Sequence, residues 1–173
     1  MTGLKKKLKG KTMFNIFKKK PNRVELFSPT DGEIIPLEAV SDEVFSSKAM
    51  GEGFAIKPVS NEIFSPIIGE VISVFPTKHA LAVKTSQGLE VLLHIGIDTV
   101  ELQGKPFEIF VKPGEKVTNE TKLATVDLSY LEQYEKPSDI MIILTNLNDL
   151  KGQLVDMQYG DQKKSTGLGY VNF

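Results

Sequence analysis

The apolar residues of this chain fall into short runs that are cut by glycine, proline and small polar residues. Runs of this length, rich in Val, Ile and Phe, favour β-strands over helices. We expect strands in GEVISVF, HALAVKT, LEVLLHI, FEIFV, KLATVD and IMIILTN, which begin at residues 69, 79, 89, 107, 122 and 140. PTDGE, TSQG and KPGE predict turns, and only LSYLEQY at 128–134, closed by Pro137, predicts a short helix. The pattern therefore predicts an all-β fold, an antiparallel β-sandwich or barrel with short helical turns.

One short pattern occurs twice. FSPTDGEII at 27–35 and FSPIIGEVI at 64–72 agree at six of nine positions, with an offset of 37 residues. Each copy predicts a proline-led turn, a glycine and then a strand. Two similar β-units that pack face to face would bury both apolar faces, so we interpret the fold as a duplication.

Charge divides the chain into two parts. Residues 1–23 contain eight Lys and Arg23 but no acid, whereas the remainder carries 12 basic and all 22 acidic residues. Such lysine density favours disorder, so we expect a basic, disordered tail at 1–23 and a single domain at 24–173. Residues 13–20 of the tail allow a weak peripheral contact with an anionic membrane, or a solvated leader. The acidic body suits a partner with a positive face, and no nucleic acid is expected.

The chain contains no cysteine, which excludes disulfides, thiolate metal sites and cysteine nucleophiles. No apolar run approaches the roughly 18 residues of a membrane helix, and no signal peptide is recognisable. These features predict a cytoplasmic location.

The only two histidines of the chain, His79 and His94, lie on either side of the turn Ser86-Gln87-Gly88. A two-residue loop at Ser86-Gln87 would pair them directly across a hairpin, on one face. A three-residue loop ending in Gly88 would shift the register by one and place them on opposite faces, unless a bulge corrected it. Both lie near one rim of the predicted sheet.

Three kinds of chemistry could use such a pair. A zinc site could take His79, His94 and Asp98, but it would lack a further histidine and a general base. Acid–base catalysis by the pair is possible, although no activated nucleophile lies nearby in the sequence. In the third, a neutral imidazole attacks a phosphoryl group while the other histidine stabilises the charge on its oxygens. The hydroxyl of Thr77 could then hold the His79 ring, and the Gly96 carbonyl could hold His94.

The stretch PTKHALAVKTSQGLEVLLHIGIDTVELQGKPFEIFVKPGEKV, from residue 76 to 117, resembles the glucose-family enzyme IIA of the phosphoenolpyruvate-dependent sugar phosphotransferase system. HIGIDTV at 94–100 carries the H-[FIL]-G-[IL]-[DN]-[ST]-V signature of that family. Residues 41–58, 64–71 and 141–146 are also similar to it and follow in the same order. The resemblance covers roughly residues 24–150, and it implies a barrel-sandwich fold of the duplicated hybrid type.

The resemblance also implies a function and a site. It makes the chain a phosphotransferase component, with His94 as the acceptor of a phosphoryl group from the carrier HPr and His79 as its stabiliser. The phosphoryl group then passes to a cysteine in the IIB domain of a membrane sugar permease. Thr77 would orient His79, and Gly96 would offer its carbonyl to His94. Neither a metal nor another cofactor is implied. The docking rim for the partners would contain Asp42, Val44, Phe45, Met50, Phe75 and Asp98.

Three alternatives belong to other classes. A zinc hydrolase would require stoichiometric zinc, and a regulatory binding module would bind its targets whether or not His94 is intact. VKPGEKVTNETKLATVD, beginning at 111, also resembles lipoyl and biotinyl hairpins, but no exposed lysine stands at the required turn.

Overall fold

A computed structural model describes residues 22–173. Each predicted apolar run forms a strand, and the predicted helix forms at 128–133, where the Asp127 side chain accepts a hydrogen bond from the Tyr130 N–H. The elements are β1 (Arg23–Phe27), β2 (Gly32–Pro36), η1 (Leu37–Ala39), α2 (Glu43–Ser46), β3 (Glu52–Pro58), β4 (Glu62–Phe64), β5 (Gly69–Val74), β6 (Ala80–Lys84), β7 (Glu90–Ile95), η2 (Thr99–Leu102), β8 (Phe107–Ile109), β9 (Lys116–Val117), β10 (Lys122–Val126), α3 (Leu128–Gln133), β11 (Ile140–Leu144), β12 (Gln153–Val155), β13 (Gly160–Gln162) and β14 (Gly167–Asn172).

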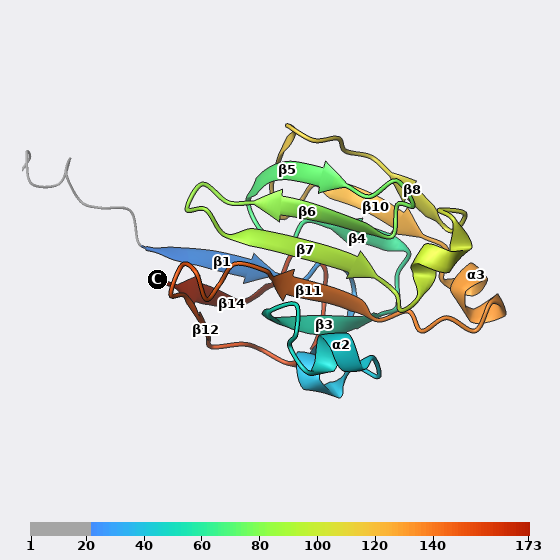
Figure 1. The fold of residues 1–173 in the computed structure, drawn as a ribbon, viewed down its shortest axis with the longest axis horizontal. Helices are drawn as coiled ribbons and strands as arrows, with labels where there is room; N and C mark the ends of the chain where they lie inside the picture. The colour runs from blue at the N-terminus through green and yellow to red at the C-terminus, as the bar shows by residue number, and fades with distance from the viewer. Residues whose placement is uncertain (1–21) are drawn as a thin grey trace, which may run out of the picture.

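The strands form three sheets whose order repeats itself. The large sheet runs β13-β2-β3-β11-β7-β6-β5-β9, and the small ones run β1-β14-β12 and β4-β10-β8. The two halves of the large sheet correspond about its centre, with β2, β3 and β13 matching β5, β6 and β9. The small sheets correspond strand for strand. All pairings are antiparallel, so the predicted all-β fold of duplicated units is confirmed (Figure 1).

The two copies of the repeated sequence bind one another reciprocally. The Phe27 N–H donates to the Pro66 carbonyl at 2.8 Å, and the Phe64 N–H donates to the Pro29 carbonyl at 2.7 Å. Each Phe-Ser-Pro turn therefore satisfies a backbone donor of the other copy. Neither turn could keep this partner in an isolated half, so the duplication forms one cooperative unit.

The serine of each copy has the same local role. Ser28 and Ser65 are both fully buried, and each hydroxyl donates to a carbonyl two residues later, at 2.7 Å to Thr30 and 2.6 Å to Ile67. A buried hydroxyl is stable only when it is hydrogen-bonded. The Phe-Ser-Pro turn therefore uses the serine hydroxyl in the same way in both copies.

The main core lies between the large sheet and the two small sheets. Apolar side chains from all three sheets meet there, including Leu26, Phe54, Ile63, Leu93 and Leu123. A second apolar cluster covers the opposite face of the large sheet, beneath η1 and α2, and contains Leu37, Phe45, Ala80, Leu92 and Met141. Side chains of β7 alternate between the two clusters, which places His94 on the face that α2 covers.

The β6–β7 hairpin adopts the three-residue loop. Thr85 donates its N–H to the Leu89 carbonyl at 2.9 Å, Gly88 has a φ of +95°, and Ala80 rather than His79 pairs with His94. The direct pairing of the two histidines is therefore wrong. His79 lies in the turn before β6 and is not paired with His94 across the hairpin.

Both ends of the described chain lie side by side. The Asn22 side-chain amide donates to the Phe173 carbonyl at 3.2 Å, and the Phe173 N–H donates to the Asn22 carbonyl at 3.1 Å. β1 begins at Arg23, one residue before the predicted domain boundary. The predicted tail otherwise lies outside the described residues, because the description begins at Asn22. Within residues 22–173, no helix combines the length and apolar character that a membrane crossing requires.

Candidate functional site

Two different backbone devices bring the histidines together. His94 is the fifth residue of β7, and its main chain pairs with Ala80 on one side and Met141 on the other. His79 ends a tight turn in which Lys78 takes a φ of +56° and donates its N–H to the Phe75 carbonyl. The two imidazole centroids lie 5.0 Å apart, with the rings nearly perpendicular at 76°. The structure thus brings together the pair that the sequence singled out.

The Nδ1 atom of each histidine is held by its predicted partner. His94 Nδ1 lies 2.8 Å from the Gly96 carbonyl oxygen, and His79 Nδ1 lies 2.6 Å from Thr77 Oγ1. A carbonyl can only accept, so the proton of neutral His94 stays on Nδ1 and Nε2 keeps a free lone pair. A threonine hydroxyl can also donate, which allows the proton of neutral His79 to lie on Nε2. In that arrangement one ring presents a lone pair at Nε2 and the other an N–H.

Two phenylalanines flank the pair. The Phe45 ring lies 4.9 Å from the His94 ring between centroids, and the Phe75 ring meets the His79 ring edge-on at 5.4 Å. Phe45 is only 6% exposed. Phe45 therefore packs against the His94 ring. It has little exposed surface to contribute to the docking rim that the sequence predicted.

Three other predicted rim residues are open to solvent. Val44, Met50 and Phe75 are 51%, 40% and 39% exposed. Sequence reasoning missed Val100, which is 48% exposed and lies in η2 directly after the histidine strand. Its signal in the sequence was its place as the final valine of HIGIDTV, directly after the histidine strand.

The predicted acidic residues Asp42 and Asp98 lie close enough to act on His94 by charge. Asp42 caps α2, where its carboxylate accepts hydrogen bonds from the N–H groups of Val44 and Phe45 at 2.9 and 3.2 Å. Asp98 is exposed, with a φ of +57° at the start of η2. The site is therefore a pair of imidazoles with carboxylates and exposed apolar side chains near it.

Burial dominates the electrostatics of the pair. It lowers the pKa of His94 below its usual value, and the neighbouring His79 lowers it further. The hydrogen bond to Gly96 and the charges of Asp42 and Asp98 oppose this shift without reversing it. Burial also lowers the pKa of His79, which is 5% exposed. Both rings are therefore neutral at neutral pH.

We expect both imidazoles to titrate with midpoints below pH 6.5, as measured from the NMR signals of their ring protons. The unfolded chain then binds more protons than the folded one between 6.5 and the lower folded pKa values. The histidine contribution to the free energy of unfolding is therefore complete above pH 6.5 and decreases as the pH falls through that window. A His94 midpoint at or above 6.5 would mean that the carboxylates outweigh burial.

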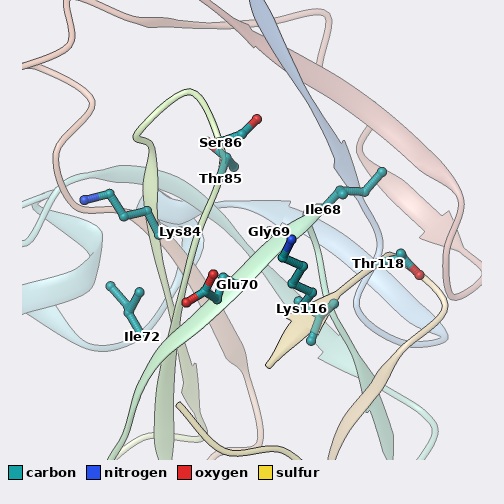
Figure 2. Close-up of a pocket in the computed structure, with 10 residues that line it drawn as sticks. Ile68, Gly69, Glu70, Ile72, Lys84, Thr85, Ser86, Lys116 and Thr118 are labelled. Atoms are coloured by element: carbon teal, nitrogen blue, oxygen red, sulfur yellow. The ribbon is translucent and has the colours of Figure 1, made fainter. Parts of the chain in front are cut away.

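Residues 22–173 form no metal-ligand cluster at the histidine pair, and the hollow on β5, β6 and β9 is lined by other residues. Among residues 22–173, no three His, Cys, Asp or Glu side chains are arranged to hold a metal ion, so His79, His94 and Asp98 do not form a zinc ligand set. A hollow of about 620 Å³ lies on β5, β6 and β9, lined by Ile68, Ile72, Lys84 and Lys116 among others. Figure 2 shows these side chains around an open surface, and none of them belongs to the histidine site.

The fold and the site together define a duplicated all-β domain that carries two facing imidazoles, each held at Nδ1. The comparisons give its family. The model for the phosphoenolpyruvate-dependent sugar phosphotransferase system, EIIA 1, matches residues 24–150, and the chain belongs to this family. As an EIIA domain of the glucose type, it is a phosphotransferase component of that system.

Known proteins agree with this assignment. The chain is 45% identical over 127 residues to the glucose-specific EIICBA component of Streptococcus pneumoniae, and 39% identical over 137 residues to that of Staphylococcus saprophyticus. Those matches cover 73% and 79% of this chain but only 18% and 20% of the relatives. Glucose permease IIA from Mycoplasma capricolum has the same fold, with a TM-score of 0.78 and 38% identity over 89% of this chain and 97% of that one.

Proposed function

We propose that this chain is a phosphocarrier in sugar uptake, and that His94 Nε2 accepts a phosphoryl group from phospho-HPr. The group then passes to the IIB cysteine of a glucose-type membrane permease. The observation that carries the proposal is the hydrogen bond from His94 Nδ1 to the Gly96 carbonyl. It keeps the lone pair on Nε2, which is the requirement for an imidazole nucleophile.

Each transfer exchanges one bond to phosphorus for another. In the first, the Nε2 lone pair of His94 attacks phosphorus, and the bond from phosphorus to the HPr histidine breaks with its electron pair returning to that imidazole. In the second, the IIB thiolate attacks and the P–Nε2 bond breaks, which restores the lone pair of His94. The electron pair of the P–Nε2 bond can return to Nε2 because Nδ1 keeps its own proton throughout.

His79 has the role of stabilising the phosphoryl group. Its ring lies 5.0 Å from that of His94 between centroids, and Thr77 Oγ1 holds its Nδ1. Donation from Nε2 would offset the charge that develops on the phosphoryl oxygens as the group moves. We therefore assign Thr77 the role of orienting His79.

The surroundings of the pair fit a docking face for more than one partner. Exposed Val44, Met50 and Phe75 supply apolar area, while Asp42 and Asp98 supply negative charge for arginines of the partners. Phe45 contributes from beneath, through its contact with His94. We further infer that residues 24–173 form a single IIA domain, that the protein acts in the cytoplasm, and that the basic residues 1–23 allow a weak membrane contact.

The test is to mix the protein with phosphoenolpyruvate, enzyme I and HPr, and to follow it by intact mass and ³¹P NMR. We expect a gain of one phosphoryl group that is lost in acid, with the chemical shift of a phosphoimidazole. Omission of HPr should prevent the adduct. If the donors are active on a reference IIA domain but leave this protein unmodified, the proposed function is wrong.

A further inference from the structure

The carbonyl that holds His94 belongs to an unusually constrained peptide. Gly96 takes a φ of +77°, so the direction of its carbonyl depends on a backbone conformation that other residues seldom adopt. The next N–H, that of Ile97, donates to the Pro137 carbonyl at 3.0 Å. The Gly96–Ile97 peptide is therefore fixed at one end by Pro137 and used at the other by His94.

The preceding peptide is fixed at both ends as well. The Gly96 N–H donates to the Asp139 carbonyl at 2.9 Å, and the Ile95 carbonyl accepts from the hydroxyl of Thr99 at 2.5 Å. Of the contacts that hold the two peptides around Gly96, only the one from Thr99 comes from a side chain other than His94. It is therefore the contact that substitution can remove.

Thr99 occupies a place that only glycine leaves open. It is fully buried, and a Cβ added at position 96 would overlap with its methyl group. The same added atom would lie 3.1 Å from the Pro137 carbonyl oxygen. Thr99 thus contacts the Gly96 backbone with its methyl group and the adjacent peptide with its hydroxyl.

The residue whose carbonyl Thr99 holds also contacts the second histidine, through the peptide on its other side. The N–H of Ile95 donates to the His79 carbonyl at 2.7 Å, while its carbonyl is the acceptor for Thr99. Ile95 lies between His94 and Gly96 in the chain. A movement of the Ile95 carbonyl would therefore change the backbone at both of these residues. The Thr99 hydroxyl therefore acts on a residue whose backbone adjoins His94 and is hydrogen-bonded to His79.

We propose that Thr99 is a positioning residue for His94: its hydroxyl, by holding the Ile95 carbonyl, keeps the Gly96 carbonyl directed at His94 Nδ1. This inference rests on the proposed function, because it concerns the nitrogen that accepts the phosphoryl group. Without the hydroxyl, the Ile95–Gly96 peptide is held only by the contact of the Gly96 N–H with Asp139, and the Gly96 carbonyl is directed less strictly at Nδ1. Neutral His94 then also populates the form with the proton on Nε2, which has no lone pair there.

The test compares Thr99→Val with Thr99→Ser and Thr85→Val. Valine keeps the shape of threonine and removes the hydroxyl, and serine keeps the hydroxyl. Thr85 is a matched control, because it is also buried and its Oγ1 accepts from the Leu89 N–H at 3.1 Å, at the other end of the β6–β7 hairpin. The primary readout is the ¹⁵N spectrum of the His94 ring, which reports which nitrogen carries the proton without any phosphoryl donor.

In wild type, Thr99→Ser and Thr85→Val, we expect the proton of neutral His94 on Nδ1. In Thr99→Val we expect a second population with the proton on Nε2, and a rate of phosphoryl acceptance from HPr that is roughly tenfold lower. An unchanged His94 tautomer in folded Thr99→Val overturns the positioning role, whatever the rate. The same shift in Thr85→Val would also overturn it, because it would reflect general loosening.

A measurement on the wild type keeps the proposal testable if Thr99→Val does not fold. The hydroxyl proton of Thr99 should exchange slowly with water and show coupling to the Ile95 carbonyl carbon. A rapidly exchanging hydroxyl overturns the proposal. Failure of wild type to accept a phosphoryl group would instead refute the proposed function and leave the ring measurements standing.

Discussion

Replacement of His94 by glutamine is expected to abolish phosphorylation of this protein to the limit of detection. Glutamine is similar in length and can still donate a hydrogen bond, but its amide nitrogen has no available lone pair for attack on phosphorus. His94 is half-buried, and its neighbours on β6 and β11 are fully buried apolar side chains. The fold should therefore survive, and intact mass after incubation with phosphoenolpyruvate, enzyme I and HPr measures the effect.

The control for that experiment is the other histidine. His79→Gln removes an imidazole whose ring lies 5.0 Å away by centroids and leaves His94 with its Gly96 partner. Under the proposal it still forms the adduct. An adduct on His94→Gln that is missing from His79→Gln would reverse the roles of the two residues.

The second large effect is expected in the onward transfer. His79→Gln should accept the phosphoryl group from HPr at close to the wild-type rate but pass it to the IIB cysteine much more slowly. Glutamine can still donate, but it lacks the imidazole Nδ1 that Thr77 holds in place. Loss of one fixed donor to developing oxygen charge costs on the order of 10²–10³-fold in rate. The measurement is single-turnover: the protein is first phosphorylated and freed of HPr, and the decay of the adduct is then followed after addition of IIB.

Acceptance from HPr is the internal control, since both steps use the same protein sample. Thr77→Val provides a graded variant, because it removes the 2.6 Å contact to His79 Nδ1 and leaves the imidazole in place. We expect its onward transfer to lie between those of wild type and His79→Gln. Normal onward transfer by His79→Gln would contradict the role assigned to His79.

The sequence predicted much of the fold because the strands that carry the core have continuous apolar runs. β11 is an example: all five residues of Ile140–Leu144 are buried. β12, β13 and β14 were not predicted, since their residues are largely half-buried or exposed and include three glycines. β14 pairs with β1, β13 with β2, and β12 with β14. A local pattern does not contain these pairings.

The histidine site was predicted in its chemistry and only partly in its geometry. Thr77 and Gly96 were identified because each lies two residues from its histidine, within local reach. The hairpin register was left open between a two-residue and a three-residue loop. The position of His79 was not predicted, since Lys78 at a φ of +56° allows a turn that the alternation of a strand does not predict. The contacts of Pro137 and Asp139 could not be found from spacing, because they reach Gly96 from 41 and 43 positions along the chain.

Asn22 and Phe173 meet at the end of the molecule that is remote from the histidines. The Gln87 side chain, in the loop of the β6–β7 hairpin, donates to the Arg23 carbonyl at 3.5 Å, whereas His79 and His94 lie at the opposite end of that hairpin (Figure 1). Another domain could thus be tethered through either end without covering the face that carries His79 and His94. A short flexible tether would hold such a domain at an effective concentration in the millimolar range, so that encounter with the histidines would no longer depend on the bulk concentration of either partner.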